Sequence, residues 1–112
     1  MEFGIFVQGH LPKRRIERVG PGAEHDAIKN ELELIQEADR HNWKYVWVTE
    51  HHFLTEYSHI SANEVFMAFA AALTDRIHFG SGIFNITPPV NHPARVAERV
   101  AMFDHVTEGR FE

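Results

Sequence analysis

Residues 44–53 read Lys-Tyr-Val-Trp-Val-Thr-Glu-His-His-Phe, and this stretch decides the fold. Its first half is rich in β-branched and aromatic residues, which favour a buried strand. Its second half places one carboxylate and two imidazoles, Glu50, His51 and His52, where that strand ends. In parallel α/β architectures the carboxyl ends of the strands open onto the active site. The stretch therefore predicts a parallel strand over residues 44–49, with ionisable groups at its functional edge.

Similar strand patterns lie on both sides of this stretch. Residues 2–8 and 76–84 are each predicted to form a strand, and residues 110–112 resemble the start of a fourth. Gly80 and Gly82 weaken the strand over 76–84 unless a bulge or a close ligand requires them. We expect the three strands to lie side by side in sequence order, joined by right-handed crossovers.

Helical patterns fill the gaps between the strands. The helix predicted over residues 24–41 carries one apolar stripe, formed by Ile28, Leu32, Ile35 and Ala38. A very apolar helix over residues 65–73 follows Ser61-Ala62-Asn63-Glu64, which has the form of a capping box. A third helix begins at His92-Pro93 and is expected to stop at Gly109. Its apolar stripe consists of Val96, Val100, Phe103 and Val106.

The connections between these elements are predicted to be loops. The longest covers residues 9–23, because Pro12, Gly20, Pro21 and Gly22 interrupt it. It carries the cations Lys13, Arg14, Arg15 and Arg18, and it is either a solvated loop or a lid that steers anions to a site. A polar loop is also expected from the end of the second strand to residue 60.

Strands and helices that alternate at this spacing predict an α/β fold with a parallel sheet. Such a sheet closes either as a doubly wound sheet or as a (β/α)8 barrel. The chain has no Gly-x-Gly-x-x-Gly after its first strand and no Walker loop, which favours the barrel. A whole barrel takes about 250 residues. Residues 1–112 are therefore predicted to form one partial domain, the N-terminal βαβαβα part of a (β/α)8 barrel.

The composition narrows the functional classes. Hydrophobic residues make up 44% and charged residues 24%, as in ordinary globular proteins. A net charge of -5 argues against a nucleic-acid binder, and the absence of cysteine excludes disulfides, thiolate metal sites and cysteine nucleophiles. No apolar run approaches the roughly 20 residues that span a bilayer, and the first residues lack the pattern of a secretory signal. We therefore expect a cytoplasmic protein that binds neither nucleic acid nor membrane.

The polar residues after the second strand are the first candidate site. Side chains alternate along a strand, so Glu50 and His52 are expected on one face and His51 on the other. Adjacent histidines fit a metal site poorly, and no metal is predicted. Two interpretations stay open for the imidazoles: acid–base or hydrogen-bonding use of one ring, and a structural hydrogen bond to a neighbouring loop.

The end of the third strand is the second candidate site. Glycine in Ser81-Gly82-Ile83 lets the backbone approach a flat ligand closely, although a plain bulge would also explain it. Trp43 and Trp47 are predicted to be core residues rather than cofactor contacts.

Several stretches together resemble the luciferase-like flavin monooxygenase family. They lie in the family's order over nearly the whole chain: residues 3–6, 47–53, 80–83, 92–95 and 104–112. The resemblance implies a (β/α)8 barrel whose members oxidise small organic substrates with reduced flavin and molecular oxygen. It also implies reduced FMN as cofactor, which many members take from a separate NAD(P)H:flavin reductase. A related branch of the family uses the deazaflavin F420 instead.

The resemblance further implies roles for individual residues. His51 matches a histidine that assists the oxygen chemistry at the flavin, and is the expected catalytic residue. Ser81, Gly82 and Ile83 match a bulge that supports the flavin ring and often contains a non-prolyl cis peptide. Phe6 matches a position that lines the flavin or substrate pocket. Residues 85–91 differ in length from the luciferase pattern.

Three functions are therefore considered: a flavin-dependent monooxygenase, an F420-dependent oxidoreductase on the same barrel, and a non-catalytic partial barrel. Three βα units leave two sheet edges open, and open edges invite pairing. We thus expect the chain to be part of a larger molecule or to self-associate as a homo-oligomer.

Overall fold

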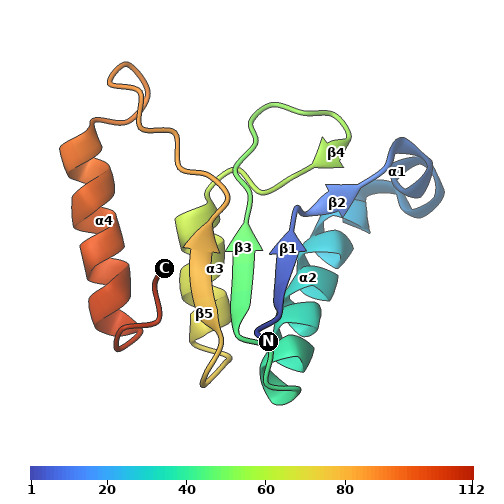
Figure 1. Ribbon diagram of the computed structural model, residues 1–112. Helices are drawn as coiled ribbons and strands as arrows, with labels where there is room; N and C mark the ends of the chain where they lie inside the picture. The colour runs from blue at the N-terminus through green and yellow to red at the C-terminus, as the bar shows by residue number, and fades with distance from the viewer.

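The computed structural model describes residues 1–112 and contains a three-stranded parallel sheet. Its strands are β1 (Gly4–Val7), β3 (Tyr45–Val48) and β5 (His78–Ser81), in the order β1-β3-β5. In Figure 1 each crossover passes behind the sheet and leads to the strand on the left, so the crossovers are right-handed. The predicted order and direction of the strands are confirmed.

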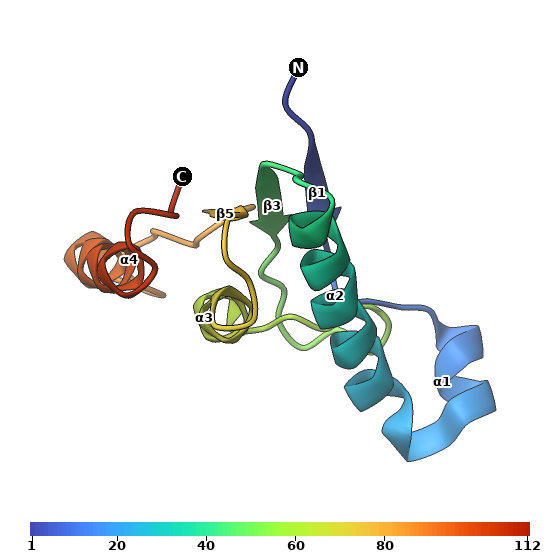
Figure 2. The same ribbon diagram turned by 90° about the horizontal axis from the view of Figure 1, so that it is seen from below.

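Three long helices accompany the sheet: α2 (Ala23–Arg40), α3 (Asn63–Ala71) and α4 (Pro93–Val106). Figure 2 shows α2 and α3 on the same side of the sheet, with α4 beyond β5. As predicted, α4 begins at Pro93, and the Nδ1 atom of His92 caps it by accepting from the Ala94 N–H at 3.2 Å. None of the helices is both long and apolar enough to cross a membrane.

The predicted start of a fourth strand is present beside β5. Phe111 forms a parallel bridge with Phe79. The Phe79 N–H donates to the Arg110 carbonyl at 2.7 Å, and the Glu112 N–H donates to the Phe79 carbonyl at 2.9 Å. The rings of Phe79 and Phe111 both pack edge-on against Phe103 of α4. The sheet therefore grows in sequence order, as in the first part of a barrel.

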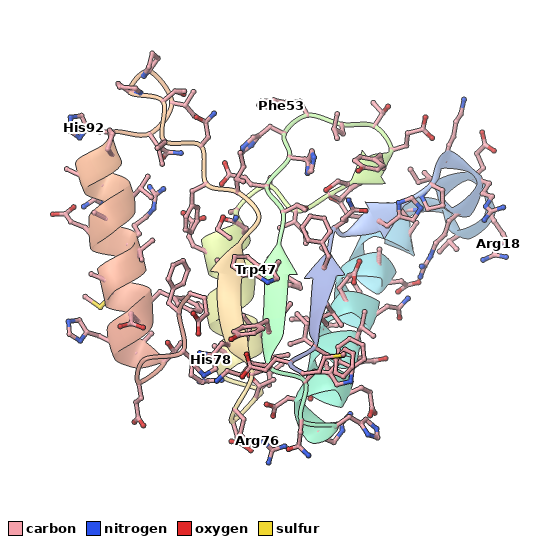
Figure 3. All side chains as sticks on the ribbon, viewed as in Figure 1. Arg18, Trp47, Phe53, Arg76, His78 and His92 are labelled. Carbon is pink, nitrogen blue, oxygen red and sulfur yellow. The ribbon has the colours of Figure 1, made fainter.

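The core lies between the sheet and the helices. It contains one side chain or more from every long element, including Val7, Val46, Val48, Ile35, Met67, Phe79 and Phe103. Side chains on the opposite face of the sheet are much more exposed: Phe6 by 58% and Trp47 by 37%. Figure 3 shows Trp47 on this second face, turned away from α2 and α3. The prediction that Trp47 belongs to the core is wrong, because strand alternation turns it away from the helices, and Trp43 is also exposed.

The predicted loop over residues 9–23 is wrong. This segment contains the short strand β2 (His10–Leu11), the helix α1 (Lys13–Val19) and the turn η1 (Gly20–Gly22). Pro12 precedes α1, and the glycines at positions 20 and 22 follow its last residue, so none of the three interrupts the helix. Ile16 holds α1 in place by packing on a small cluster of Leu11, Ala23 and Ala27.

The polar loop predicted up to residue 60 also contains a strand. Tyr57 and Ser58 form β4, which pairs antiparallel with β2. The Ser58 hydroxyl donates to the Gln8 carbonyl at 2.5 Å. The small sheet ties the segment after β3 to the segment after β1, above the ends of both strands.

The predicted capping box at residues 61–64 does not form. The residue that caps α3 is Ala62, and it makes no side-chain capping bond. Glu64 turns instead toward α4, where its Oε1 atom lies 3.1 Å from Nε of Arg99. The Glu64 carboxylate therefore forms an ion pair with Arg99 of α4 instead of the capping hydrogen bond that the sequence pattern predicted.

Gly80 is required because the Trp47 indole lies directly over it. A Cβ atom at residue 80 would lie 2.3 Å from two atoms of that ring. Gly80→Ala is therefore expected to displace Trp47 and to cost about 1–3 kcal/mol in the free energy of unfolding, as overpacking does. In a Trp47→Ala background the same change should cost less than about 1 kcal/mol, measured by urea unfolding of the full-length protein. Equal costs in the two backgrounds would show that the indole is not the obstacle.

Candidate functional site

The candidate residues gather where β1, β3 and β5 end. All three strands are parallel, so their carboxyl ends share one edge of the sheet. The segments that leave this edge are residues 8–9, 49–60 and 82–92. Figure 3 shows Phe53 at the tip of the segment after β3, above the strand ends. The predicted functional edge therefore exists, and each candidate residue lies on it or beside it.

Glu50 and His52 form a pair on one side of this edge. Nε2 of His52 lies 2.8 Å from Oε1 of Glu50, whose side chain is only 9% exposed. Both residues line a hollow together with Ile83 and the residues up to Thr87. Glu50 and His52 lie together as predicted, although β3 ends at Val48 and the chain beyond it is not a strand.

His51 lies on the other side, against the segment that contains β4. Its N–H donates to the Ile60 carbonyl at 2.8 Å, and its ring stands edge-on to Tyr57 at 5.7 Å between centroids. The Nδ1 atom of His51 is buried and has no hydrogen-bond partner in the protein. A second pocket, lined by His51, Ser58 and His59 among others, lies here. The structure contains no group of three or more side chains arranged to hold a metal ion.

The segment Ser81-Gly82-Ile83 is fixed by hydrogen bonds to its neighbours. The Gly82 N–H donates to the Val48 carbonyl at 2.7 Å. The Ser81 hydroxyl accepts from Nδ2 of Asn63 at 2.9 Å, so it faces α3 rather than the open face of the sheet. The chain contains no cis peptide bond, so the non-prolyl cis peptide implied by the family resemblance is absent. The Ile83 side chain is 69% exposed and lines the hollow that also contains Glu50 and His52.

An exposed apolar floor extends from this segment across the sheet. Phe6 and Trp47 form it, and we call these two residues the apolar floor. Gly82 lets the Phe6 ring approach closely, since a Cβ atom there would lie 3.0 Å from it. Flat aromatic ligands bind to such surfaces by stacking and by burying apolar area. The residues present therefore fit a flat ring system at the carboxyl edge of the sheet.

Asn63 is a site residue that the sequence did not reveal. It is fully buried at the start of α3, and its Nδ2 atom lies within hydrogen-bonding distance of Ser81 Oγ and of the Ile83 carbonyl, the latter at 3.3 Å. The same atom lies 3.4 Å from the Val48 carbonyl. Asn63 thus joins the ends of β3 and β5. The sequence signal for it was a single amide side chain at the start of a very apolar helix. The signal was missed because residues 61–64 were interpreted as a capping box.

Asn63→Ala is expected to loosen the end of β5. Losing a buried hydrogen-bond partner costs about 1–3 kcal/mol in the free energy of unfolding, because the acceptors it leaves stay buried. Amide hydrogen exchange in the full-length protein should become faster at Gly82 and Ile83 and stay unchanged in β1. The exposed neighbour Ala62, changed to Ser, provides a control. Unchanged exchange at residues 82–83 would contradict this role.

Comparison with known proteins identifies the family. The family model described as luciferase-like monooxygenase matches residues 1–112. The chain is 41% identical over 85 residues to the 4-hydroxyprotoasukamycin monooxygenase of Streptomyces nodosus subsp. asukaensis, which covers 76% of this chain and 22% of that protein. It is 38% identical over 84 residues to the limonene 1,2-monooxygenase of Rhodococcus erythropolis, covering 75% of this chain and 21% of that protein.

A solved structure shows the same fold. The oxygenating constituent of 3,6-diketocamphane monooxygenase from Pseudomonas putida, a type II Baeyer–Villiger monooxygenase in complex with FMN, superposes with a TM-score of 0.79 at 22% identity. The match covers 99% of this chain and 28% of that one. The fold is therefore a partial barrel, and the chain spans about a fifth to a third of the length of the proteins it matches. By its sequence and its fold, the chain belongs to the luciferase-like monooxygenase family.

Proposed function

We propose that the protein is the N-terminal part of a flavin-dependent monooxygenase that uses reduced FMN and molecular oxygen on a small organic substrate. The observation that carries the proposal is the apolar floor on the open face of a parallel sheet whose carboxyl edge carries His51 and the Glu50–His52 pair. In barrel enzymes this edge holds the active site. An apolar surface next to a few polar groups is the usual form of a cofactor pocket.

The apolar floor and the segment Ser81-Gly82-Ile83 would hold the cofactor. Phe6 and Ile83 would contact its ring, and Ser81 would contribute through Asn63, which fixes the backbone at the end of β5. When bound, reduced FMN would supply the electrons that activate oxygen. Trp47 would separate the ring from the lower part of the sheet and keep water out.

His51 is the proposed acid–base residue. An imidazole takes up and releases protons near neutral pH, as oxygen activation and substrate oxidation require. Its backbone N–H, bonded to the Ile60 carbonyl, fixes the main chain, and the edge-on contact with Tyr57 positions the ring. Such fixed orientation lowers the entropic cost of proton transfer.

The partners of the proposed enzyme follow from the same proposal. We propose a separate NAD(P)H:flavin reductase as the source of reduced FMN, and the cytoplasm as the place where both proteins act. The apolar floor is open in this chain, so we propose that further βα units of a longer chain, or a second copy, cover it.

The proposed function is tested with the full-length protein and photoreduced FMN. Reduced FMN should quench the fluorescence of Trp47 on binding, and oxygen should then be consumed when a panel of small aldehydes, ketones and terpenes is added. A Trp47→Phe variant should lose this quenching, and a Trp43→Phe variant, changed just before the start of β3, is the matched control that should keep it. Binding of F420 but not FMN, with no oxygen consumption, would instead support the F420-dependent alternative.

A further inference from the structure

A pocket formed by β2 and α1 is lined mainly by basic side chains, and the proposed reaction gives it no role. Its volume is about 530 Å³. The residues that line it, which we call the basic pocket, are His10, Pro12, Arg14, Arg15 and Arg18 (Figure 3). The whole chain has a net charge of -5, so this concentration of cations is opposite in sign to the rest of the chain.

The pattern of α1 directs three guanidinium groups toward the basic pocket. Arg18 follows Arg14 by four residues and Arg15 by three, so the three side chains share one face of the helix. Ile16 lies on the opposite face and packs on the apolar cluster at the start of α2. The packing of Ile16 therefore fixes the direction in which the arginines point.

The three arginines of the basic pocket have no acidic partner. None of them forms an ion pair or a hydrogen bond through its side chain. Every other arginine of the chain does: Arg40, Arg76, Arg95, Arg99 and Arg110. The carboxylates that reach β2 and α1 accept from backbone instead, Glu31 from the His10 N–H and Glu56 from the Lys13 N–H. Like charges at this spacing destabilise a helix, and a bound anion would offset that repulsion.

The chemistry of the basic pocket fits a phosphate group. A guanidinium binds phosphate through two parallel N–H···O bonds. A phosphate monoester carries a charge of about -1.5 to -2 at pH 7 and three strong acceptor oxygens, which match the three guanidiniums. A carboxylate has fewer oxygens and less charge, so it would leave part of the pocket unpaired. No apolar side chain is present to stack on a flavin ring.

The basic pocket lies beside the candidate active site. The rings of His10 and Tyr57 meet edge-on at 6.1 Å between centroids, and the ring of Tyr57 meets that of His51 edge-on at 5.7 Å. The pairing of β2 with β4 holds this arrangement, since Tyr57 lies opposite Leu11 in the register. One exposed aromatic ring therefore separates the pocket from the proposed acid–base residue.

We propose that the basic pocket binds a phosphate group at one end of the organic substrate and so directs the other end past Tyr57 toward His51. This inference rests on the proposed function, because the ligand is the substrate of the proposed oxidation. It narrows that substrate to small organic molecules with a terminal phosphate. The phosphate is a handle, and no bond to it forms or breaks. Inorganic phosphate and the phosphate of FMN share its chemistry, and the experiments distinguish the three sources.

The first test measures binding and needs no turnover. In titration calorimetry of the full-length protein, hexyl phosphate should bind at least about tenfold more tightly than either hexanol or inorganic phosphate, because only hexyl phosphate has both a charged group and an apolar chain. Combining Arg14→Gln with Arg18→Gln should remove this preference without unfolding the protein, since both side chains are exposed. Lys13→Gln is the matched control, because it removes a charge from α1 outside the pocket.

Three results of this test would overturn the proposal. Equal affinity for hexyl phosphate and inorganic phosphate would assign the pocket to a free anion. Equal affinity of the wild type and the double variant for hexyl phosphate would place its phosphate elsewhere. A loss of FMN affinity in the double variant but not in Lys13→Gln would assign the pocket to the cofactor phosphate.

The second test is kinetic and compares two aldehydes that differ only at the far end. With photoreduced FMN and oxygen, an aldehyde with a terminal phosphate should have a KM at least about tenfold lower than the same aldehyde with a terminal hydroxyl. The double variant should lose this ratio, and Lys13→Gln should keep it. Equal KM values in the wild type would overturn the role of the pocket in substrate binding. If hexyl phosphate binds as expected but neither aldehyde is oxidised, the proposed function fails and the phosphate site stands.

Discussion

Replacing His51 by alanine is expected to lower turnover of the full-length enzyme about 10²–10⁴-fold, the usual contribution of one acid–base group. Flavin affinity should change far less, because in the proposed enzyme the apolar floor and the end of β5 would supply the ring contacts. Steady-state product yield and stopped-flow measurement of oxygen consumption check the two parts separately. A loss of kcat without a loss of flavin binding identifies a residue that acts on the reaction rather than on assembly.

His52→Ala is the matched comparison for this experiment. His52 lies next to His51 in sequence but on the other side of the strand end, paired with Glu50. We expect this change to disorder the hollow around Ile83 and to reduce turnover less than His51→Ala does. If His52→Ala abolishes product formation while His51→Ala retains it, the acid–base role belongs to the Glu50–His52 pair. If both variants keep their yield, the Glu-His-His segment is structural.

Replacing Asp39 by alanine is expected to lower the free energy of unfolding by at least about 3 kcal/mol. The Asp39 carboxylate is buried at the end of α2 and accepts from three consecutive N–H groups, those of Asp75, Arg76 and Ile77, at 3.0, 2.9 and 2.8 Å. Hydrogen bonds to a charged group contribute about 1.5–3 kcal/mol each, and the N–H of the buried Ile77 would be left without a partner. The change also frees the turn that leads into β5. Urea unfolding of the full-length protein measures the loss.

The contribution of Asp39 should also depend on pH. Burial by itself raises the pKa of Asp39, but the three backbone hydrogen bonds and the charge of Arg76 outweigh it and hold the pKa below its ordinary value. A carboxyl whose pKa is lower when folded stabilises the protein above its unfolded pKa of about 3.9. This stability is lost as pH falls through the lower folded pKa. The difference in the free energy of unfolding between the wild type and Asp39→Asn should therefore be smaller at pH 3 than at pH 7.

An exposed carboxylate on the same helix provides the control for both measurements. Glu33 faces solvent and belongs to no ion pair, so Glu33→Ala should change the free energy of unfolding by less than about 0.5 kcal/mol at either pH. If Asp39→Ala lowers the free energy of unfolding as little as Glu33→Ala does, water replaces the Asp39 carboxylate as a hydrogen-bond partner without loss of stability.

Elements that bury an apolar stripe were predictable from the sequence. The strand around Val46 and Val48 and the helix that carries Leu32 and Ile35 show the period of their structure, because one face of each packs in the core. The small elements were not predictable in this way. Helix α1 buries no residue, and β2 and β4 contain two residues each, so their patterns are too short to show a period.

The candidate site was predictable only as far as strand alternation determines it. Alternation correctly paired Glu50 with His52, but His51 and His52 both line the pocket beside β4. The contacts of Asn63 depend on residues far apart in the chain. The pattern Ser61-x-x-Glu64 indicated a cap, but Arg99 of α4 binds Glu64 instead. Local signals cannot reveal partners that only the fold brings together. The roles assigned to His51, Phe6, Ser81, Gly82 and Ile83 stay predictions.

The bridge between Phe111 and Phe79 has a consequence for the order in which the chain acquires its structure. Every group that seats Phe111, from the backbone of Phe79 to the ring of Phe103, is synthesised before it. Domains fold from their N-terminal side as synthesis proceeds at about 5–20 residues per second. Each new strand can therefore pair with a sheet edge that has already formed when the strand leaves the ribosome. A nascent chain of this kind can add its strands one by one, and each added strand protects the edge on which it docks.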